Sequence, residues 1–243
     1  MRSVWEPKTA TAIILLITAI VIPGNARSQG LRGDSEAVAM ARTMIQQMGG
    51  SRLWAEAMTL RIVEEVHRPN ERLPYRSEAW RSLNEPSIWC RSQSAEVDHT
   101  FARTHEQGWN LGEGRLTKLS EMDVRQWVGR WPRNIYVMFH RLAREDPRLW
   151  LVKEQERRFA ALDEGTADKL CAFEVTVGGA ILRWSTAFGT GAEEWIYGPL
   201  TDFGPIRMPA WGVRLQDAYR FYYREVTLSK TAPPVSFEAP RPR

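Results

Sequence analysis

The helical repeat appears in only two stretches of this chain, and segments of alternating apolar and polar residues fill most of the rest. Apolar side chains fall three or four positions apart at 34–48 and again between 120 and 144, which is the spacing of one helix face. The segments at 60–112 and 170–228 instead alternate and are separated by Gly, Pro and Asn, as strands and turns are. This order predicts an α+β fold, in which a few helices cover one face of a curved antiparallel sheet.

Capping residues indicate the helix boundaries. Asp34 or Ser35 can cap the first helix, and the glycine pair at 49–50 ends it because glycine readily adopts the left-handed conformation. Ser120 and Asp123 resemble a capping box, with Asp in the position where Glu is usual. We expect helices at 34–48, 121–130 and 133–144, and strands at 60–66, 75–83, 87–94, 97–106, 195–197, 206–208, 212–215 and 219–228.

The clearest strand pair is a hairpin around the glycines at 178–179, a two-residue loop that tolerates positive φ. Counting outward from this loop gives one wholly apolar face and one face with an opposite-charge pair. A shift of one residue would destroy both agreements, so the register is well specified. The predicted partners are Val175 with Leu182, Glu174 with Arg183, and Phe173 with Trp184.

The first 28 residues have the pattern of a secretory signal peptide. Arg2 and Lys8 precede an uncharged apolar run at Ala10–Ile22, and small residues follow at the two positions that a signal peptidase reads, 26 and 28. We expect cleavage before Gln29 and a periplasmic or secreted protein. The apolar run is shorter than the about 20 residues of a membrane span. An uncleaved N-terminal anchor is the alternative.

Charge does not favour a polyanionic partner. Removing residues 1–28 lowers the basic residues from 33 to 30 and the acidic residues from 29 to 28, which leaves a net charge of +2. Basic residues are spread along the chain, often beside acidic ones, as in Arg141-Leu-Ala-Arg-Glu-Asp. This distribution indicates a solvated surface and argues against nucleic acid as a partner.

A series of short motifs in a fixed order resembles a known family. The opening helix is followed by Met48-Gly-Gly and Trp54, and Gly-Trp-Asn-Leu-Gly-Glu-Gly stands at 108–114. A helix pair fills 120–144, Tyr-Gly-Pro-Leu-Thr-Asp-Phe-Gly-Pro-Ile-Arg-Met-Pro runs from 197, and Val-Ser-Phe-Glu-Ala-Pro closes the chain from 235. Over most of 35–240 this order resembles the LolA/LolB-like half-barrel superfamily of outer-membrane lipoprotein carriers and receptors.

The resemblance implies an incomplete antiparallel β-barrel around a hydrophobic cavity, with helices as a lid. In the carriers this cavity holds acyl chains. We therefore expect one half-barrel domain at 29–229 with a helical insertion at about 120–144, preceded by the signal peptide at 1–28 and followed by an irregular proline-rich tail at 230–243. The expected function is binding of a hydrophobic ligand, either a lipid or a lipidated partner, with a possible peripheral contact to the envelope.

The apolar face of the hairpin is the candidate lining of that cavity. A pocket lined by such side chains binds a lipid-like ligand without dedicated polar chemistry. The alternative is a dry core filled by the same side chains. The candidate ligand-binding residues are Trp109, Phe173, Val175, Leu182, Trp184, Trp195 and Tyr197.

The two cysteines, Cys90 and Cys171, are a disulfide candidate because both share parity with apolar neighbours in their strands. Exported proteins meet an oxidising compartment, where a pair of cysteines can form a bridge. Two separate buried thiols are the alternative, since free cysteine is among the most buried residue types.

Catalytic chemistry has no recognisable motif here: the sequence has no HExxH, G-x-S-x-G, P-loop or dinucleotide fingerprint. His99 and His105 share parity, but six residues of extended strand put them about 20 Å apart, too far for one metal ion. We expect no catalytic residue, no metal and no cofactor. The alternatives to ligand binding are a non-catalytic envelope interaction or scaffold module with a filled barrel and, with weaker support, an exported hydrolase.

Overall fold

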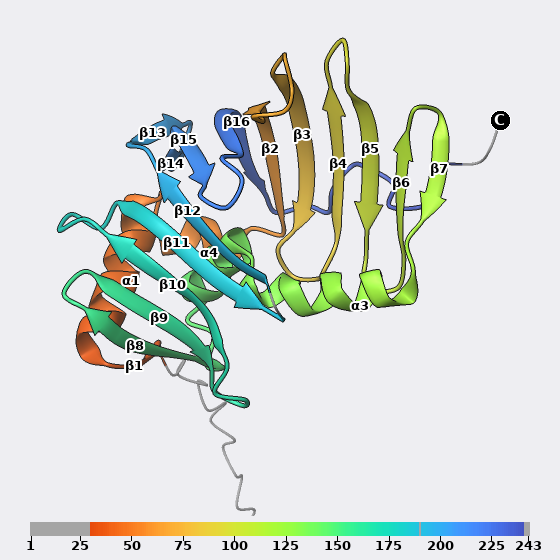
Figure 1. The fold of residues 1–243 in the computed structure, drawn as a ribbon. Coiled ribbons are helices and arrows are strands. Elements are labelled where there is room, and N and C mark those ends of the chain that lie inside the picture. The colour runs from red at the N-terminus through yellow and green to blue at the C-terminus, as the bar shows by residue number, and fades with distance from the viewer. Residues whose placement is uncertain (1–29, 190, 241–243) are drawn as a thin grey trace, which may run out of the picture.

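A computed structural model describes residues 30–189 and 191–240 of the chain. Fourteen of the described strands form one continuous curved sheet, whose two edges are β1 and β7 and do not meet (Figure 1). The fold is therefore the open antiparallel half-barrel of the α+β class that the sequence predicted. The expected signal peptide and its cleavage site lie outside the described residues. In the described part of the chain, no helix is both long and apolar enough to cross a membrane.

The sheet is antiparallel throughout except where β1 pairs in parallel with β8. The short strands β13 (Leu200–Phe203) and β14 (Ile206–Pro209) form a separate hairpin. From one edge of the large sheet to the other, the order is β1 (Arg32–Gly33), β8 (Leu149–Gln155), β9 (Arg158–Asp163), β10 (Lys169–Val175), β11 (Ile181–Phe188), β12 (Gly191–Tyr197), β15 (Trp211–Arg214), β16 (Arg220–Ser229), β2 (Thr59–His67), β3 (Tyr75–Ser82), β4 (Ile88–Gln93), β5 (Asp98–Arg103), β6 (Gly108–Gly112) and β7 (Arg115–Lys118).

The helices lie against two different parts of this sheet. They are α1 (Ser35–Gln47), α2 (Ser51–Glu56), α3 (Glu121–Arg130), the single 3-10 turn η1 (Trp131–Arg133) and α4 (Ile135–Ala143). Helix α1 packs on β8 and β9 and contacts α4, whereas α3 runs past the ends of β3–β6 (Figure 1). We call the strands β8–β12 with α1 and α4 the packed half, and the strands β2–β7 with α3 the open half.

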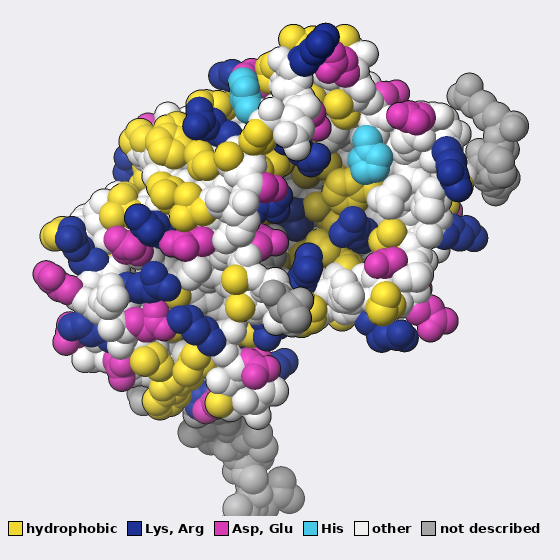
Figure 2. Space-filling model, in the orientation of Figure 1, with side chains coloured by type: hydrophobic (Ala, Val, Ile, Leu, Met, Phe, Trp, Pro, Cys, Tyr) yellow, Lys and Arg dark blue, Asp and Glu magenta, His cyan; other side chains and the backbone are white. Residues whose placement is uncertain are grey.

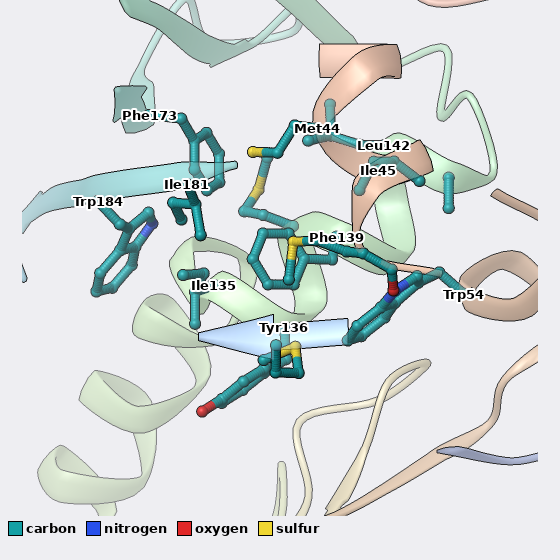
Figure 3. Close-up of a cluster of buried hydrophobic side chains, with 14 of the residues drawn as sticks. Met44, Ile45, Trp54, Ile135, Tyr136, Phe139, Leu142, Phe173, Ile181 and Trp184 are labelled. Carbon is teal, nitrogen blue, oxygen red and sulfur yellow. The ribbon is translucent and has the colours of Figure 1, made fainter. Parts of the chain in front are cut away.

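Aromatic side chains fill the packed half. Phe173 of β10 is fully buried, stacks on Phe159 of β9 with ring centroids 5.3 Å apart, and lies 5.9 Å from Phe139 of α4. Trp54 of α2 contacts Phe139 edge to face at 5.3 Å and donates its indole N–H to the Met48 carbonyl. These contacts close the space between the helices and the sheet (Figure 3).

Side-chain hydrogen bonds fix the starts of α3 and α1 in different ways. The capping box predicted at Ser120 and Asp123 is confirmed: each side chain accepts a hydrogen bond from the other residue's backbone N–H, at 3.2 Å. Asp34 is the residue before α1, but its carboxylate accepts from the backbone N–H of Lys153 instead of capping the helix. That hydrogen bond fixes the start of α1 to β8.

The β10–β11 hairpin differs from the predicted register next to its loop. Phe173 pairs with Trp184 and Glu174 with Arg183 as predicted, but a bulge then pairs Val175 with Ile181. Thr176 and Ala180 close a three-residue loop instead of the predicted two-residue loop. Gly179 explains the difference. Its φ is +86°, and a Cβ on it would lie 2.9 Å from the Thr43 backbone, so this loop packs closely on α1.

The tail after β16 has no helix or strand in its described part, 230–240. It runs behind the open half of the sheet (Figure 1). The indole N–H of Trp109 donates to the carbonyl of Phe237 at 2.9 Å, which holds the tail against β6.

Candidate ligand-binding site

The inner face of the sheet is defined here as the face that carries Leu60 and Phe173, since both belong to the core under the helices. In the packed half, α1 and α4 cover this face. In the open half, inner side chains such as His99, Phe101 and Arg103 are only half-buried. Figure 2 shows a hollow at this place, with a hydrophobic floor and Lys or Arg side chains around it.

A cavity of about 290 Å³ lies where α3, η1, β5 and the β11–β12 hairpin meet. We call it the α3 cavity. Its volume is close to the lower end of the range for small-molecule sites. Its lining is apolar at Leu119, Trp127, Trp184 and Phe188, and polar at Arg103, Asp123, Gln126, Arg130, Arg133, Asn134, Thr186 and Glu193, with Gly191 completing it.

Helix α3 can close this cavity because it carries a glycine at the contact point. A Cβ on Gly129 would lie 2.4 Å from the ring of Phe188, so any other residue would force this ring to move. The close approach brings the end of β11 against the helix that crosses the open half. The cavity therefore lies between two segments separated by more than fifty positions in sequence.

Strand register places two arginines of the open half in one cross-strand row. Arg81 pairs with Ile88, and Ile88 pairs with Arg103, so the two arginines stand two strands apart, at about 10 Å. Leu60 precedes them in the same row and belongs to the core, so both arginines point toward the helices. The guanidinium of Arg81 lies 5.5 Å from the ring centre of Tyr136 on α4.

Neither of these arginines has an acidic partner within 4 Å in the described structure, nor does either donate a side-chain hydrogen bond there. The Nε atoms of Arg81 and Arg103 are both shielded from solvent without an acceptor. Burial lowers the pKa of each side chain below the usual value for arginine. An unsatisfied buried donor is uncommon in native proteins. The row of Arg81 and Arg103 is therefore a place where a ligand with hydrogen-bond acceptors can bind.

Glu64 lies on the inner face of β2, enclosed by protein although its side chain retains some exposed area. The hydroxyl of Tyr219 donates to its carboxylate at 3.3 Å. Desolvation raises the pKa of Glu64 to about 7, partly offset by that hydrogen bond and by the charge of Arg81. Nearby, Tyr136 and Tyr223 share a hydrogen bond between their hydroxyls. The open half thus has a polar interior, unlike the packed half.

Two of the predicted ligand-binding residues lie deep in the core of the packed half. Phe173 is fully buried under Phe139, and Val175 is 2% exposed in the same core. Both residues therefore lie in a filled core, which the sequence analysis gave as the alternative to a ligand cavity.

Three further predicted residues lie on β11 and β12, the strands of the packed half that are nearest to the open half. Trp184 is 5% exposed and lines the α3 cavity. Trp195 packs edge to face on Tyr219, with ring centres 5.6 Å apart. Tyr197 is buried and borders a separate shallow pocket near Trp211. Of the three, only Trp184 reaches the cavity.

The structure corrects the placement of the other two. Leu182 is the extra residue of the bulge, so it does not pair with Val175 and lines the shallow pocket of Tyr197 instead. Trp109 pairs with Ala102 on the outer face and is covered by the tail through its hydrogen bond to Phe237. Neither residue shares a surface with Phe173.

The two cysteines are free and buried in the described structure, which is the alternative that the sequence analysis had left open. Cys90 lies on β4 and contacts the Ser77 hydroxyl at 3.4 Å, whereas Cys171 lies on β10. Six strands separate β4 from β10 in the sheet order. At about 4.8 Å per strand this spacing exceeds the reach of a disulfide.

We therefore expect two reactive thiols per chain in the unfolded, non-reduced protein and almost none in the folded one. Burial raises the pKa of both thiols, that of Cys171 to about 12, so the reactive thiolate is scarce at neutral pH. Maleimide labelling followed by intact-mass measurement, with and without denaturant, tests this expectation. A denatured chain that takes up no label would show a bridge.

Polar clusters of the kind that bind metals are absent from the described residues, where no group of three or more His, Cys, Asp or Glu side chains converges. His140 is buried, and its ring nitrogens contact the Trp54 carbonyl at 2.8 Å and the Asn84 amide oxygen at 3.2 Å. Its role is to join α4 to the segments around it.

Sequence reasoning missed Glu64, Arg81, Arg103 and Trp127. A signal existed, because Arg81 has the same parity as Tyr75 and Ser77, which are buried. This alternation alone does not show which side of the strand faces the helices. Only the strand pairing in the folded sheet shows that the side with Arg81 is the inner one.

Comparisons with known proteins find similar solved structures at low sequence identity. No protein-family model matches the sequence, and no curated protein matches it. Similar solved structures include a LolA superfamily protein from Nitrosomonas europaea, with 10% identity, 79% of this chain and 93% of that chain covered, and a TM-score of 0.39. A putative outer membrane lipoprotein-sorting protein domain from Vibrio parahaemolyticus has 9% identity, 83% and 96% coverage, and a TM-score of 0.38. A DUF1329 family protein from Desulfovibrio piger has 7% identity, 84% and 98% coverage, and a TM-score of 0.38.

One of these solved structures is a member of the superfamily that the motifs of this chain resembled. Identities of 7–10% do not establish a shared function. The function proposed next therefore rests on the side chains of this chain.

Proposed function

We propose that this protein binds the apolar part of a lipid or of a lipidated partner in the α3 cavity. The observation that carries the proposal is the cavity itself, about 290 Å³ with Leu119, Trp127, Trp184 and Phe188 in its lining. Burying an acyl chain there would release about 25 cal/mol for each Å² of apolar surface removed from water. No catalytic residue is needed for such binding, and we assign none.

Export to the envelope is part of the same proposal, because lipids and lipidated proteins are found there. It rests on the charged start, the apolar run at 10–22 and the small residues at 26 and 28. The N-terminus of the protein purified from the envelope is expected at Gln29 or within a few residues of it. An intact Met1 would favour the anchored alternative.

Binding of 1-tetradecanol, an uncharged amphiphile, tests the proposed site. We expect one molecule bound per chain by native mass spectrometry. Gln126 is exposed on α3 and lines the cavity, so Gln126→Trp should fill it and reduce the bound fraction at least about tenfold. Arg125→Trp adds the same bulk on the neighbouring exposed residue outside the lining and should leave binding unchanged.

The packed half favours a second candidate, an envelope scaffold whose barrel is filled. Its core around Phe173 leaves no room for a ligand. If neither tetradecanol nor an anionic amphiphile of the same chain length binds, or if the ligand binds equally to both Trp variants, the α3 cavity is not a ligand site and the scaffold function replaces our proposal.

A further inference from the structure

Three arginine side chains of the described residues line the α3 cavity: Arg103 from β5, Arg130 from α3 and Arg133 from η1. In the described structure, Arg103 and Arg130 have no carboxylate within 4 Å and donate no side-chain hydrogen bond. Arg133 donates through Nη1 to the Gly129 carbonyl at 2.9 Å and lies 3.9 Å from Asp168. The cavity therefore contains guanidinium groups whose charge is not neutralised by close ion pairs.

Two of these guanidiniums also have buried donors without partners. The Nε atoms of Arg103 and Arg133 are shielded from solvent, and neither meets an acceptor in the part of the chain that the structure describes. Leaving a buried donor unsatisfied costs folding free energy, more for a charged group. An acceptor brought in by a ligand would remove this cost.

The acidic residues of the lining offset the charge of the arginines only in part. Asp123 accepts hydrogen bonds from the backbone and hydroxyl of Ser120, which engage its carboxylate in the helix cap. Glu193 accepts from the indole of Trp195 at 3.4 Å. With three arginines and two carboxylates, the lining carries a net charge of +1.

Aromatic rings hold the guanidiniums in place. Arg103 lies 5.0 Å from the ring centre of Phe101 and 5.8 Å from that of Trp127, and Arg133 lies 5.1 Å from that of Phe188. A guanidinium stacked on a ring keeps its N–H groups available at the edge, where they match the oxygens of a carboxylate or phosphate. The rings also supply apolar surface for a chain attached to such a head group.

We infer that the ligand of the α3 cavity is an anionic amphiphile, with its phosphate or carboxylate on Arg103, Arg130 and Arg133 and its apolar chain against Trp127, Trp184 and Phe188. This inference rests on the proposed function, because it names the chemical class of ligand for the same cavity. It goes further by naming the arginines whose polar contacts make the affinity depend on the head group when ligands have the same chain length.

Affinities of four ligands with the same fourteen-carbon chain test the inference: tetradecanol, tetradecanoate, tetradecyl phosphate and tetradecyltrimethylammonium. Charge-assisted hydrogen bonds are worth about 1.5–3 kcal/mol, so at least one anion should bind about 10- to 100-fold more tightly than tetradecanol. The cation should bind more weakly than tetradecanol. The tighter of the two anions identifies the head group.

Substitutions of single arginines then show which side chains cause the preference for an anion over the alcohol. Arg103→Met should bring the ratio of anion to alcohol affinity close to one, while tetradecanol still binds. Arg130→Met alters an exposed residue of α3, so it tests the same ratio without risk to the fold. Arg125→Met is the matched control, because Arg125 pairs only with Glu121 in the described structure and lies outside the lining, and its ratio should equal that of the wild type.

The inference is overturned if the wild-type protein binds alcohol and anions equally, prefers the cation, or keeps its anion preference in both Arg103→Met and Arg130→Met. These results leave the proposed function standing, because tetradecanol still binds. Failure of tetradecanol and both anions to bind would instead contradict the proposed function.

Discussion

Phe173→Ala is expected to destabilise the protein by about 3–5 kcal/mol, the largest effect of any single truncation proposed here. Phe173 is fully buried between Phe159 and Phe139, and removing its ring would leave a cavity that α4 and β9 can close only in part. Equilibrium unfolding in urea measures the change in the free energy of unfolding.

Val177→Ala is the control on the same hairpin, since Val177 is 88% exposed at the loop. It should change the free energy of unfolding by less than about 0.5 kcal/mol. Similar losses for the two variants would mean that the packed half is not closed as described.

Glu64→Gln is expected to stabilise the protein at alkaline pH and to have little effect in acid. Desolvation raises the pKa of Glu64 from its ordinary value of 4.5 to about 7 in the folded protein, so the folded state holds the proton more tightly than the unfolded chain. The associated stability is present below pH 4.5 and is lost as the pH rises to 7. Above pH 7 the folded wild type contains a desolvated carboxylate, which costs at most about 3 kcal/mol.

Unfolding in urea at pH 5 and at pH 8.5 measures this dependence. Glu64→Gln should be more stable than the wild type by about 2–3 kcal/mol at pH 8.5, and by under about 1 kcal/mol at pH 5. Glu65→Gln is the control, because Arg224 and His67 lower the pKa of the neighbouring Glu65, and its removal should cost under about 1 kcal/mol at pH 8.5. A Glu64 variant that is no more stable at pH 8.5 would show that the carboxylate is well solvated.

Local sequence signals predicted the local elements well. The range of α3 and its capping box at Ser120 and Asp123 could be read from sequence because their hydrogen bonds join residues three positions apart. The partners Phe173 and Trp184 were also predicted, since alternation of apolar residues fixes which side of a strand faces the core.

Non-local contacts explain the predictions that were wrong. The loop at 177–179 is one residue longer than predicted because Gly179 adopts its conformation against Thr43 of α1, far away in the sequence. Trp109 is buried although it lies on the outer face of the sheet, because the tail covers it and the Phe237 carbonyl accepts its indole N–H. The sequence around Gly179 does not predict its contact with α1, and the sequence around Trp109 does not predict its contact with the tail.

The candidate site was the least predictable part for the same reason. Trp184 was chosen as an apolar hairpin residue, but the cavity that it lines is completed by α3 and β5. Arg103 and Trp127 have no sequence motif in common, and only the folded sheet brings them to within 5.8 Å. The apolar pattern identified the core correctly, and of the seven predicted ligand-binding residues only Trp184 lines the α3 cavity.

Photo-crosslinking tests the central claim, which is that the packed half is filled and the α3 cavity accepts an apolar chain. The protein is incubated with a palmitic acid that carries a diazirine near the end of its chain, irradiated and digested, and the labelled peptides are identified by mass spectrometry. Our account predicts label on segments around the cavity, from 119–134 and 184–188, and none on Phe173 or the core residues of α1. Label concentrated on α1, β9 and β10, with the α3 segment unmodified, would contradict it.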